Sequence, residues 1–538
     1  MSSVTENRNS IPIVVGVTGH RQLRPQDEAA LRESVKAQLL RLRALCPSSP
    51  LHMLTSLAEG GDLLCAEEAD ALGIPLIAAL PCPPEDYQKD FSDAGRAKLN
   101  SFCEKAEAVF VAPAAEAVPA EGPGRDFLFR QAGIYVAAHS HVLLALWDGG
   151  EGTEAACGTA EAVGFALHGN YAPVSGMPLR SALNEGVIHV FTPRGARCEK
   201  EAGAVELLGD WDAVRDVLAK TNEYNRLASD VDTGARTLVP ERDFDDPVLR
   251  RMERVGLTAG RLSAFSAAKF RRALALLAVA ATLLTLGFLL YDEAQAIWMI
   301  LVCGLVLLAA WLLHRYAARS DCHRRYIEYR VLAECMRVQV FLRYAGSGRE
   351  ASELLSWSQQ EETAWIMAAL CALTPGQRPA QAHEIRDCWA GEQRRYHARA
   401  AEKAERRTRV SERTVRIALI LSVALYCAAV VFELLCGGAI LAPTFLVADA
   451  EACRTVLKIV LGTISAVTLF VSNYYGRLSL SRTLSDHGKM ERFFARISAE
   501  LARRGQTEAL LELLAREELT ENGNWCSYQR DNKPEISL

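Results

Sequence analysis

Residues 273–313, ALALLAVAATLLTLGFLLYDEAQAIWMILVCGLVLLAAWLL, decide the fold of this chain. They hold two uncharged apolar runs, Ala273–Leu290 and Ala296–Leu313, on either side of the short acidic break Tyr291-Asp292-Glu293. An α-helix needs about 20 apolar residues to cross the roughly 30 Å hydrocarbon core of a bilayer. Each run is therefore predicted to span a membrane, and the pair to form a hairpin.

A second pair of apolar runs, Ile417–Leu435 and Val456–Tyr475, predicts two further spans. Glu433 and Lys458 fall near the outer interface of this pair. Two interpretations are open: these charges lie at the lipid interface, or they form a charged vestibule or an ion pair between the third and fourth spans.

Basic residues flank both hairpins on the side of the chain ends. Arg271 and Arg272 precede the first hairpin and Arg315 and Arg319 follow it, whereas the only charged residues of its turn are Asp292 and Glu293. Around the second pair the basic residues are Arg406, Arg407, Arg409, Arg413, Arg416, Arg477 and Arg482. The positive-inside rule then predicts an inner- or plasma-membrane protein with four spans and with both termini in the cytoplasm.

The composition limits the remaining possibilities. The 538 residues carry a formal net charge of -5, so no overall basic field recruits nucleic acid. The 15 cysteines form no C-x-x-C pair and no cluster with histidine, which predicts reduced thiols in a reducing compartment and no metal site. No cofactor is expected beyond a nucleotide-type ligand.

The segment before the first hairpin alternates strand-like and helix-like patterns. Such alternation predicts a Rossmann-like α/β domain, a doubly wound parallel sheet with helices on both faces. The expected strands are Ile11–Val17, Leu51–Thr55, Ile74–Leu80, Ala108–Ala112, Val142–Trp147 and Val187–Phe191. In sheets of this kind ligands bind beyond the carboxyl ends of the strands.

Glycine-bearing turns follow the first, second and fifth of these strands and therefore lie on that one edge. Glycines there allow the backbone to approach a phosphate, hydroxyls and Arg21 can bind its oxygens, and Asp148 or Glu161 can accept from ribose. The predicted ligand-binding residues are Gly16, Thr18, Gly19, His20, Arg21, Ser56, Glu59, Gly60, Gly61, Asp62, Asp148, Gly149, Gly158, Thr159 and Glu161.

These motifs resemble those of the SLOG superfamily. The likeness covers roughly the first 195 residues and rests on Gly16–Arg21, Ser56 with Glu59–Asp62, Trp147–Gly149 and Gly158–Glu161, in that order. The superfamily includes the DprA-type and LOG phosphoribohydrolase folds and the cytoplasmic sensor domain of melastatin-type TRP channels. The resemblance implies a domain that binds a nucleotide or a nucleotide-derived messenger.

The enzymatic branch of that superfamily places a catalytic glutamate in a P-G-G-x-G-T-x-x-E signature. The position resembling it here is Glu161, but Ala156-Cys157 stands where glycines are expected, and Glu161 follows Thr159 by two residues instead of three. The resemblance therefore gives Glu161 a catalytic role only if the domain is a hydrolase.

The C-terminal half predicts an all-α membrane domain with long charged helices after each hairpin. The stripe Ile327, Val331, Cys335, Val338 and Leu342 and the mixed segment Leu484–Arg504 indicate helices that pack within the chain or on a neighbouring subunit. This half resembles the paired-helix membrane effector modules fused to SLOG sensors in bacterial conflict systems, through Tyr329-Arg330-Val331-Leu332-Ala333-Glu334, Arg337 and Gln339.

The predicted organisation has five parts. They are an α/β nucleotide-binding domain (1–195), a helical linker (196–260), the first hairpin with its cytoplasmic helix (261–345), a cytoplasmic helical segment (346–405) and the second hairpin with C-terminal helices (406–538).

Three functions fit this organisation. The first is a membrane-anchored receptor-effector of antiviral or conflict defence, a homo-oligomer in which a bound messenger gates or assembles a pore, or disrupts the bilayer. The second is a membrane-tethered nucleotide hydrolase or phosphoribohydrolase. The third is a scaffolding membrane protein whose α/β domain has lost its ligand. No P-loop, H-E-x-x-H or G-x-S-x-G motif is present, so the sequence favours a non-enzymatic role.

Overall fold

A computed structural model describes residues 9–150, 158–168, 186–194, 200–234, 236–240, 246–293, 297–379, 381–437, 450–477 and 480–531. The chain divides into two units. Unit 1 comprises residues 1–262, 328–385 and 506–526, and unit 2 comprises residues 263–327, 386–505 and 527–538. The boundaries near residues 262 and 327 fall inside helices α8 (Pro247–Glu293) and α10 (Cys322–Tyr344).

Unit 1 is built on a seven-stranded, mostly parallel sheet in the order β4-β3-β2-β1-β5-β6-β7. The strands are β1 (Ile13–Gly19), β2 (Leu51–Thr55), β3 (Leu76–Leu80), β4 (Ala108–Val111), β5 (Val142–Trp147), β6 (Gly186–Phe191) and β7 (Val205–Leu208). β1 pairs with β2 on one side and with β5 on the other, so the strand order reverses between β1 and β5. This confirms the predicted Rossmann-like α/β arrangement.

The sheet differs from the prediction in strand bounds and in one added strand. β3 begins at Leu76 instead of Ile74. β1 starts two residues later than expected and extends through Thr18 and Gly19, because both residues continue the pairing with β5. β7 was not predicted and pairs antiparallel with β6, so the sheet continues past residue 195. β7 is short and partly exposed, so it lacks the buried apolar run that marked the other strands.

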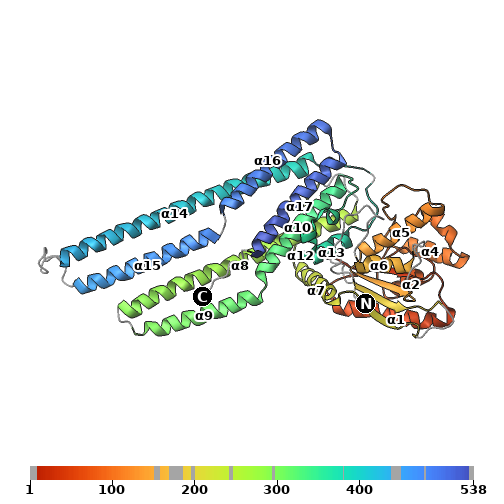
Figure 1. Cartoon of the computed structure of the whole chain (residues 1–538), viewed down its shortest axis with the longest axis horizontal. Helices are drawn as coiled ribbons and strands as arrows, with labels where there is room; N and C mark the ends of the chain where they lie inside the picture. Colours follow the sequence, from red (N-terminus) through yellow and green to blue (C-terminus); the bar gives the residue numbers. More distant parts are fainter. Residues whose placement is uncertain are drawn as a thin grey trace. The chain divides into compact units, whose positions relative to one another are not determined.

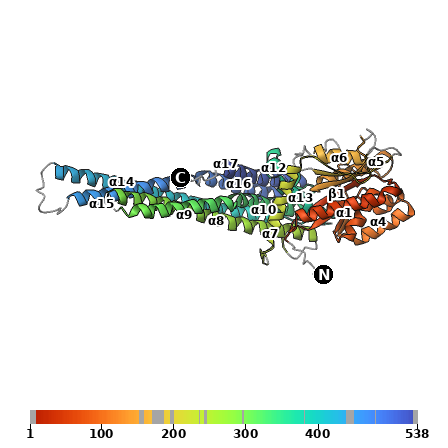
Figure 2. The same cartoon turned by 90° about the horizontal axis from the view of Figure 1, so that it is seen from below.

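Helices cover both faces of the sheet (Figures 1 and 2). On one face, apolar residues of α1 (Glu28–Leu45), α2 (Gly61–Ala71) and α4 (Asp93–Lys105) share a core with the sheet. On the other, α5 (Gly122–Ala138) and α6 (Thr159–His168) share a second core with it. Short helical turns connect the strands: η1 (Pro25–Asp27), α3 (Pro84–Tyr87) and η2 (Gln88–Asp90).

Helices also complete unit 1. They are α7 (Trp211–Ala228), the first part of α8, most of α10, α11 (Ala351–Leu354), α12 (Trp357–Glu362), α13 (Ala364–Leu373) and most of α17 (Glu508–Asp531). The predicted stripe on α10 is confirmed, since Val331, Cys335, Val338 and Leu342 are all buried. Trp365 of α13 donates a hydrogen bond to Glu328 of α10 (3.1 Å).

Unit 2 is largely helical. It contains the second part of α8, α9 (Met299–Arg319), the start of α10, a π-helical turn (Arg386–Gly391), α14 (Glu392–Gly437), α15 (Ala450–Arg477) and α16 (Leu480–Arg504). In both views α8 lies beside α9 and α14 beside α15 (Figures 1 and 2).

Three helices of the described chain are long and apolar enough to cross a membrane. These candidate spans lie in Pro247–Asp292, Met299–Tyr344 and Arg386–Leu435, and therefore contain the first and third predicted spans and most of the second. Their apolar side chains are widely exposed, for example Leu301 at 72% and Leu434 at 66%, as expected for a surface covered by lipid. The fourth predicted span falls in α15, which is not among the three, so the count of four remains a prediction.

One predicted detail of the first hairpin needs correction. Tyr291, Asp292 and Glu293 do not interrupt the helix but form the last residues of α8, because none of them is a proline, the residue that removes a helical N–H donor. The next helix, α9, begins at Met299, and the predicted start of that span, Ala296, lies outside the described residues.

Glu433, at the end of the third predicted span in α14, forms an ion pair with α15. Nε and Nη2 of Arg454 donate to the two carboxylate oxygens of Glu433, at 2.7 and 2.8 Å. The sequence suggested Glu433 and Lys458 as the charged residues of this pair of spans; the described partner of Glu433 is Arg454, one helical turn earlier on α15. A two-point guanidinium–carboxylate contact fixes one orientation between the helices.

Candidate functional site

A cavity of about 320 Å³ opens at the carboxyl edge of the sheet. Its walls come from the ends of β1, β2 and β3, from the start of α6 and from one face of α5. The position next to the reversal of strand order between β1 and β5 is where doubly wound sheets bind their ligands. The volume is within the range for small-molecule sites.

The cavity brings together nine of the fifteen predicted binding residues. They are Thr18, Gly19, His20, Arg21, Ser56, Asp62, Gly158, Thr159 and Glu161. The other six, Gly16, Glu59, Gly60, Gly61, Asp148 and Gly149, do not line it. Of these, Asp148 and the glycines at 60 and 61 support residues that do, and Glu59 instead binds Ser92 at the start of α4.

His20, Asp148 and Arg194 form a chain of polar contacts at one side of the cavity. Arg194 Nη2 lies 2.5 Å from His20 Nδ1, and His20 Nε2 lies 3.2 Å from Asp148 Oδ1. Arginine can only donate, so Nδ1 is unprotonated and Nε2 carries the proton. The Asp148 amide is also 3.0 Å from Nε2, but a protonated nitrogen cannot accept from it, so the carboxylate is the partner.

The electrostatics of this group favour a neutral imidazole. Burial lowers the pKa of His20, the charge of Arg194 lowers it further, and Asp148 only partly opposes them. Burial raises the pKa of Asp148, but the Gly150 amide, His20 and Arg194 together hold it below its ordinary value. A neutral His20 accepts from Arg194 without repelling it, and so orients a cation whose side chain is 59% exposed.

The glycines of the first two turns pack backbone against backbone. A Cβ atom on Gly19 would lie 2.8 Å from Gly61 Cα, and a Cβ on Gly60 would lie 2.3 Å from the carbonyl oxygen of Arg21. The Gly61 amide donates to the His20 carbonyl (2.9 Å). Gly19, Gly60 and Gly61 thus hold the end of β1 against the start of α2, a packing role distinct from the phosphate approach expected of them.

Asp62 is a buried carboxylic acid in the cavity wall. Its Oδ2 accepts from the Thr55 hydroxyl (3.0 Å) and from the Ala58 amide (3.4 Å). Burial raises the pKa of Asp62 to about 7, although Thr55, Ala58, Arg21 and the Gly19 backbone each lower it. A group that changes charge near neutral pH therefore faces the cavity.

The stability of the protein is expected to fall as the pH rises through this range. A carboxyl group whose pKa is raised on folding binds its proton more tightly in the folded state. Its favourable contribution is therefore present below about pH 4 and is lost as the pH approaches about 7. In Asp62→Asn, the free energy of unfolding should fall less over this pH range than in the wild type, by on the order of 3 kcal/mol.

Urea unfolding of the full chain in detergent at pH 5 and pH 8 measures the effect. Asp212→Asn, at a side chain that is 94% exposed, is the matched control and should follow the wild type. Equal pH dependence in Asp62→Asn and wild type would show that Asp62 does not titrate in this range.

Glu161 forms an ion pair inside the cavity. Its Oε1 lies 2.8 Å from Arg130 Nε of α5. The pair links the first turn of α6 to the middle of α5 and leaves the second carboxylate oxygen without a hydrogen bond among the described residues. The carboxylate is therefore partly neutralised and less suited to act as a free nucleophile.

Four important lining residues were not predicted: Tyr87, Phe129, Arg130 and Arg194. They come from α3, α5 and the segment after β6, which carry no glycine-rich motif. The segment after β6 could have been considered, because it too ends at the carboxyl edge. The residues of α5 that line the cavity could not have been predicted, since helical spacing alone does not show which face of a helix packs on the sheet.

A second cavity of about 440 Å³ lies against the opposite face of α5. Phe129, Gly133 and Val136 of α5 line the first cavity, whereas Ile134 and His139 line the second. On a helix these two sets point in opposite directions. α5 therefore lines the candidate ligand cavity with one face, and with the other face it lines a cavity shared with residues 348–350, Glu353, Arg378 and Glu508.

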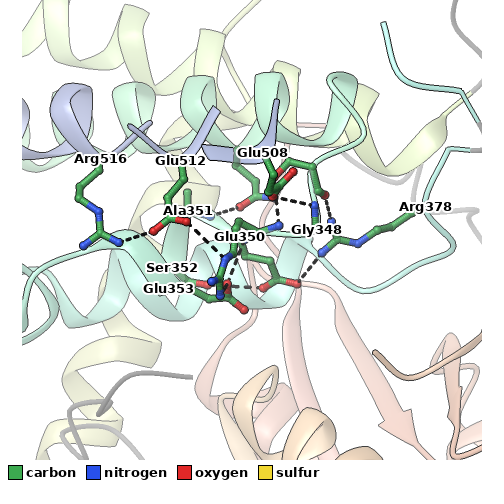
Figure 3. Close-up of polar contacts among 12 residues, drawn as sticks. Gly348, Glu350, Ala351, Ser352, Glu353, Arg378, Glu508, Glu512 and Arg516 are labelled. Atoms are coloured by element: carbon green, nitrogen blue, oxygen red, sulfur yellow. Dashed lines mark hydrogen bonds and ion pairs between the residues drawn. The ribbon is translucent and has the colours of Figure 1, made fainter. Parts of the chain in front are cut away.

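A buried ion pair between His139 and Glu350 joins the end of α5 to the start of α11. His139 donates to the Tyr135 carbonyl through Nδ1 (2.8 Å), so its Nε2, 3.0 Å from Glu350, also needs a proton to bond the carboxylate. Glu350 is additionally 3.6 Å from Arg378. Figure 3 shows Glu350 within a network that continues through Glu353, Glu508 and Glu512.

Comparison with known proteins adds no family to this description: no protein-family model matches the chain, and no curated protein matches it. In the described residues no group of three or more His, Cys, Asp or Glu side chains could hold a metal ion.

Proposed function

We propose that the chain is a membrane-anchored receptor-effector. A nucleotide-derived messenger binds the first cavity, and its binding rearranges the membrane helices so that they open or assemble a pore. The observation that carries this proposal is the joining, in one chain, of an arginine-rimmed cavity at the strand reversal to three helices able to cross a bilayer.

The chemistry of the cavity supports an anionic ligand. Arg21, Arg130 and Arg194 line it, together with the first turn of the ten-residue helix α6. Guanidinium groups bind phosphate oxygens in two-point contacts, and helix N-termini present free amides and a positive dipole end. The hydroxyls of Thr18 and Ser56 add donors for the same oxygens.

The placement of α5 supports a route for the response. α5 lines the ligand cavity with one face and contacts Glu350 through His139 at its end. Glu350 follows α10, a helix whose first residues belong to unit 2 and whose remainder belongs to unit 1. A messenger shifts the arrangement of these helices only if it binds one arrangement more tightly than the other.

Binding is the first test. The purified full chain is titrated with AMP, GMP, ADP-ribose and cyclic dinucleotides by calorimetry, and the positive ligands are added to the protein in dye-loaded liposomes. We expect binding and ligand-dependent leakage. Arg194→Ala should weaken binding about tenfold or more, because a charged hydrogen bond to phosphate is lost.

The control is Arg215→Ala, which removes an exposed arginine of α7 that does not line the cavity. It should bind like wild type. Binding without leakage under any condition would contradict the pore, and absence of binding to every nucleotide would contradict the receptor.

A membrane-tethered nucleotide hydrolase is the second candidate. Asp62, whose pKa of about 7 suits proton transfer at neutral pH, lies in the same cavity wall as Glu161. Chromatography of each bound nucleotide after incubation distinguishes the two candidates. Product formation abolished by Glu161→Ala would favour the hydrolase, and stoichiometric binding without product would favour the receptor.

A further inference from the structure

Tyr87 lines the first cavity and carries a buried hydroxyl. The residue ends the short helix α3 after β3 and is 0% exposed. Its phenol oxygen has no hydrogen-bond partner in the described parts of the chain. A buried hydroxyl without a partner is unfavourable, and a ligand atom in the adjoining cavity would supply the partner.

Aromatic packing fixes the position of this hydroxyl. The ring of Tyr87 lies edge-on to Phe91, with centroids 5.0 Å apart, and 5.6 Å from Phe129. Phe129 in turn lies beneath the guanidinium groups of Arg21 and Arg125, at 5.2 and 5.5 Å. The hydroxyl therefore cannot turn elsewhere to find another partner without disturbing this cluster.

Asp62 lines the same cavity and, when ionised, supplies the opposite hydrogen-bonding character. The Thr55 hydroxyl and the Ala58 amide both donate to its Oδ2, and of these two residues only Ala58 lines the cavity. The phenol of Tyr87 keeps its proton, because burial raises its pKa far above the ordinary value. The cavity wall thus offers one donor and one acceptor.

We propose that Tyr87 and Asp62 together bind a sugar hydroxyl of the ligand, so that the messenger is a ribonucleotide with its ribose at this wall and its phosphate toward Arg130 and Arg194. A sugar hydroxyl can accept from Tyr87 and donate to Asp62 through one oxygen atom. An amino group only donates, and a phosphate only accepts. This inference rests on the proposed nucleotide-binding function and names the part of the ligand that the wall selects.

Tyr87→Phe removes the hydroxyl and keeps the ring. In the ligand-free full chain it should raise the melting temperature, because an unpartnered polar group leaves the interior. It should also weaken binding of the ribonucleotide found by the titration about tenfold. The wild type should bind the ribonucleotide better than its 2′-deoxy and 3′-deoxy analogues, and Tyr87→Phe should reduce that preference.

Tyr224→Phe is the matched control. Tyr224 is equally buried, but its hydroxyl donates to the Val255 carbonyl (3.0 Å). Its loss should lower the melting temperature and leave nucleotide affinity unchanged.

These measurements distinguish a failure of the hydroxyl assignment from a failure of the proposed function. A lower melting temperature in Tyr87→Phe, unchanged affinity, or wild-type protein that binds both deoxy analogues as well as the ribonucleotide would overturn the hydroxyl assignment alone. Wild-type protein that binds no nucleotide would overturn the proposed function and this inference with it.

Discussion

Gly60→Ala is expected to destabilise the protein by about 4 to 5 kcal/mol. Gly60 has φ +100° and ψ -118°, a conformation that residues with a Cβ atom almost never adopt. The added Cβ would also lie 2.3 and 2.4 Å from the carbonyl oxygens of Arg21 and His20. Both obstacles are backbone atoms, so no side-chain rotation relieves the contact.

The substitution should also affect the cavity, because Gly60 packs against the backbone of His20 and Arg21, which line it. Moving the carbonyls of His20 and Arg21 would break the Gly61 amide bond to His20 and displace the end of β1 from α2. Urea unfolding followed by tryptophan fluorescence measures the loss of stability, and nucleotide titration measures the loss of binding.

Gly73→Ala is the control for this substitution. Gly73 also has a positive φ, +64°, but an added Cβ would have no atom within 4 Å. It should cost only about 1 kcal/mol, the ordinary penalty of the left-handed region. Equal effects at the two glycines would mean that the crowding against Arg21 and His20 relaxes easily.

Glu350→Ala is expected to cost about 4 kcal/mol. The carboxylate is 5% exposed and is 3.0 Å from His139 and 3.6 Å from Arg378. Its removal leaves two cationic groups without their shared partner in a region from which water is largely excluded. It also removes the side chain that caps the start of α11.

The pH dependence of the wild type should show the same interaction. Burial raises the pKa of Glu350, but the charge and hydrogen bond of His139, with Arg378 and Ser352, bring it below the ordinary value. A lowered carboxyl pKa stabilises the fold above the ordinary value of 4.5, and this contribution is lost as the pH falls further. Glu350→Gln should be less sensitive to acid than the wild type.

Glu512→Ala tests whether burial is the cause. Glu512 belongs to the same network in Figure 3 and is 2.6 Å from Arg516, but its side chain is 30% exposed. An exposed pair of this kind contributes about 0 to 1 kcal/mol. If Glu512→Ala were as damaging as Glu350→Ala, the network and not the buried pair would stabilise this part of unit 1.

The class of each half followed from local patterns. Uncharged runs of 18 residues such as Ala273–Leu290 predict membrane helices because the lipid core sets their length and composition. Strands alternating with helices predict a parallel sheet, and the common edge of their glycine turns predicted where Thr18, Ser56 and Gly158 would meet. These features depend on the chemistry of neighbours along the chain, so the sequence alone determined them.

Contacts between distant segments could not be read in this way. The place of Tyr87 and Asp62 in the lining of one cavity, the pairing of Arg130 with Glu161 and the pairing of His139 with Glu350 each join elements that no spacing rule connects. The same is true of Gly19 and Gly61, whose lack of a side chain serves helix–strand packing and not only the ligand. Only the tertiary structure decided them, because burial and partner identity arise when the layers pack together.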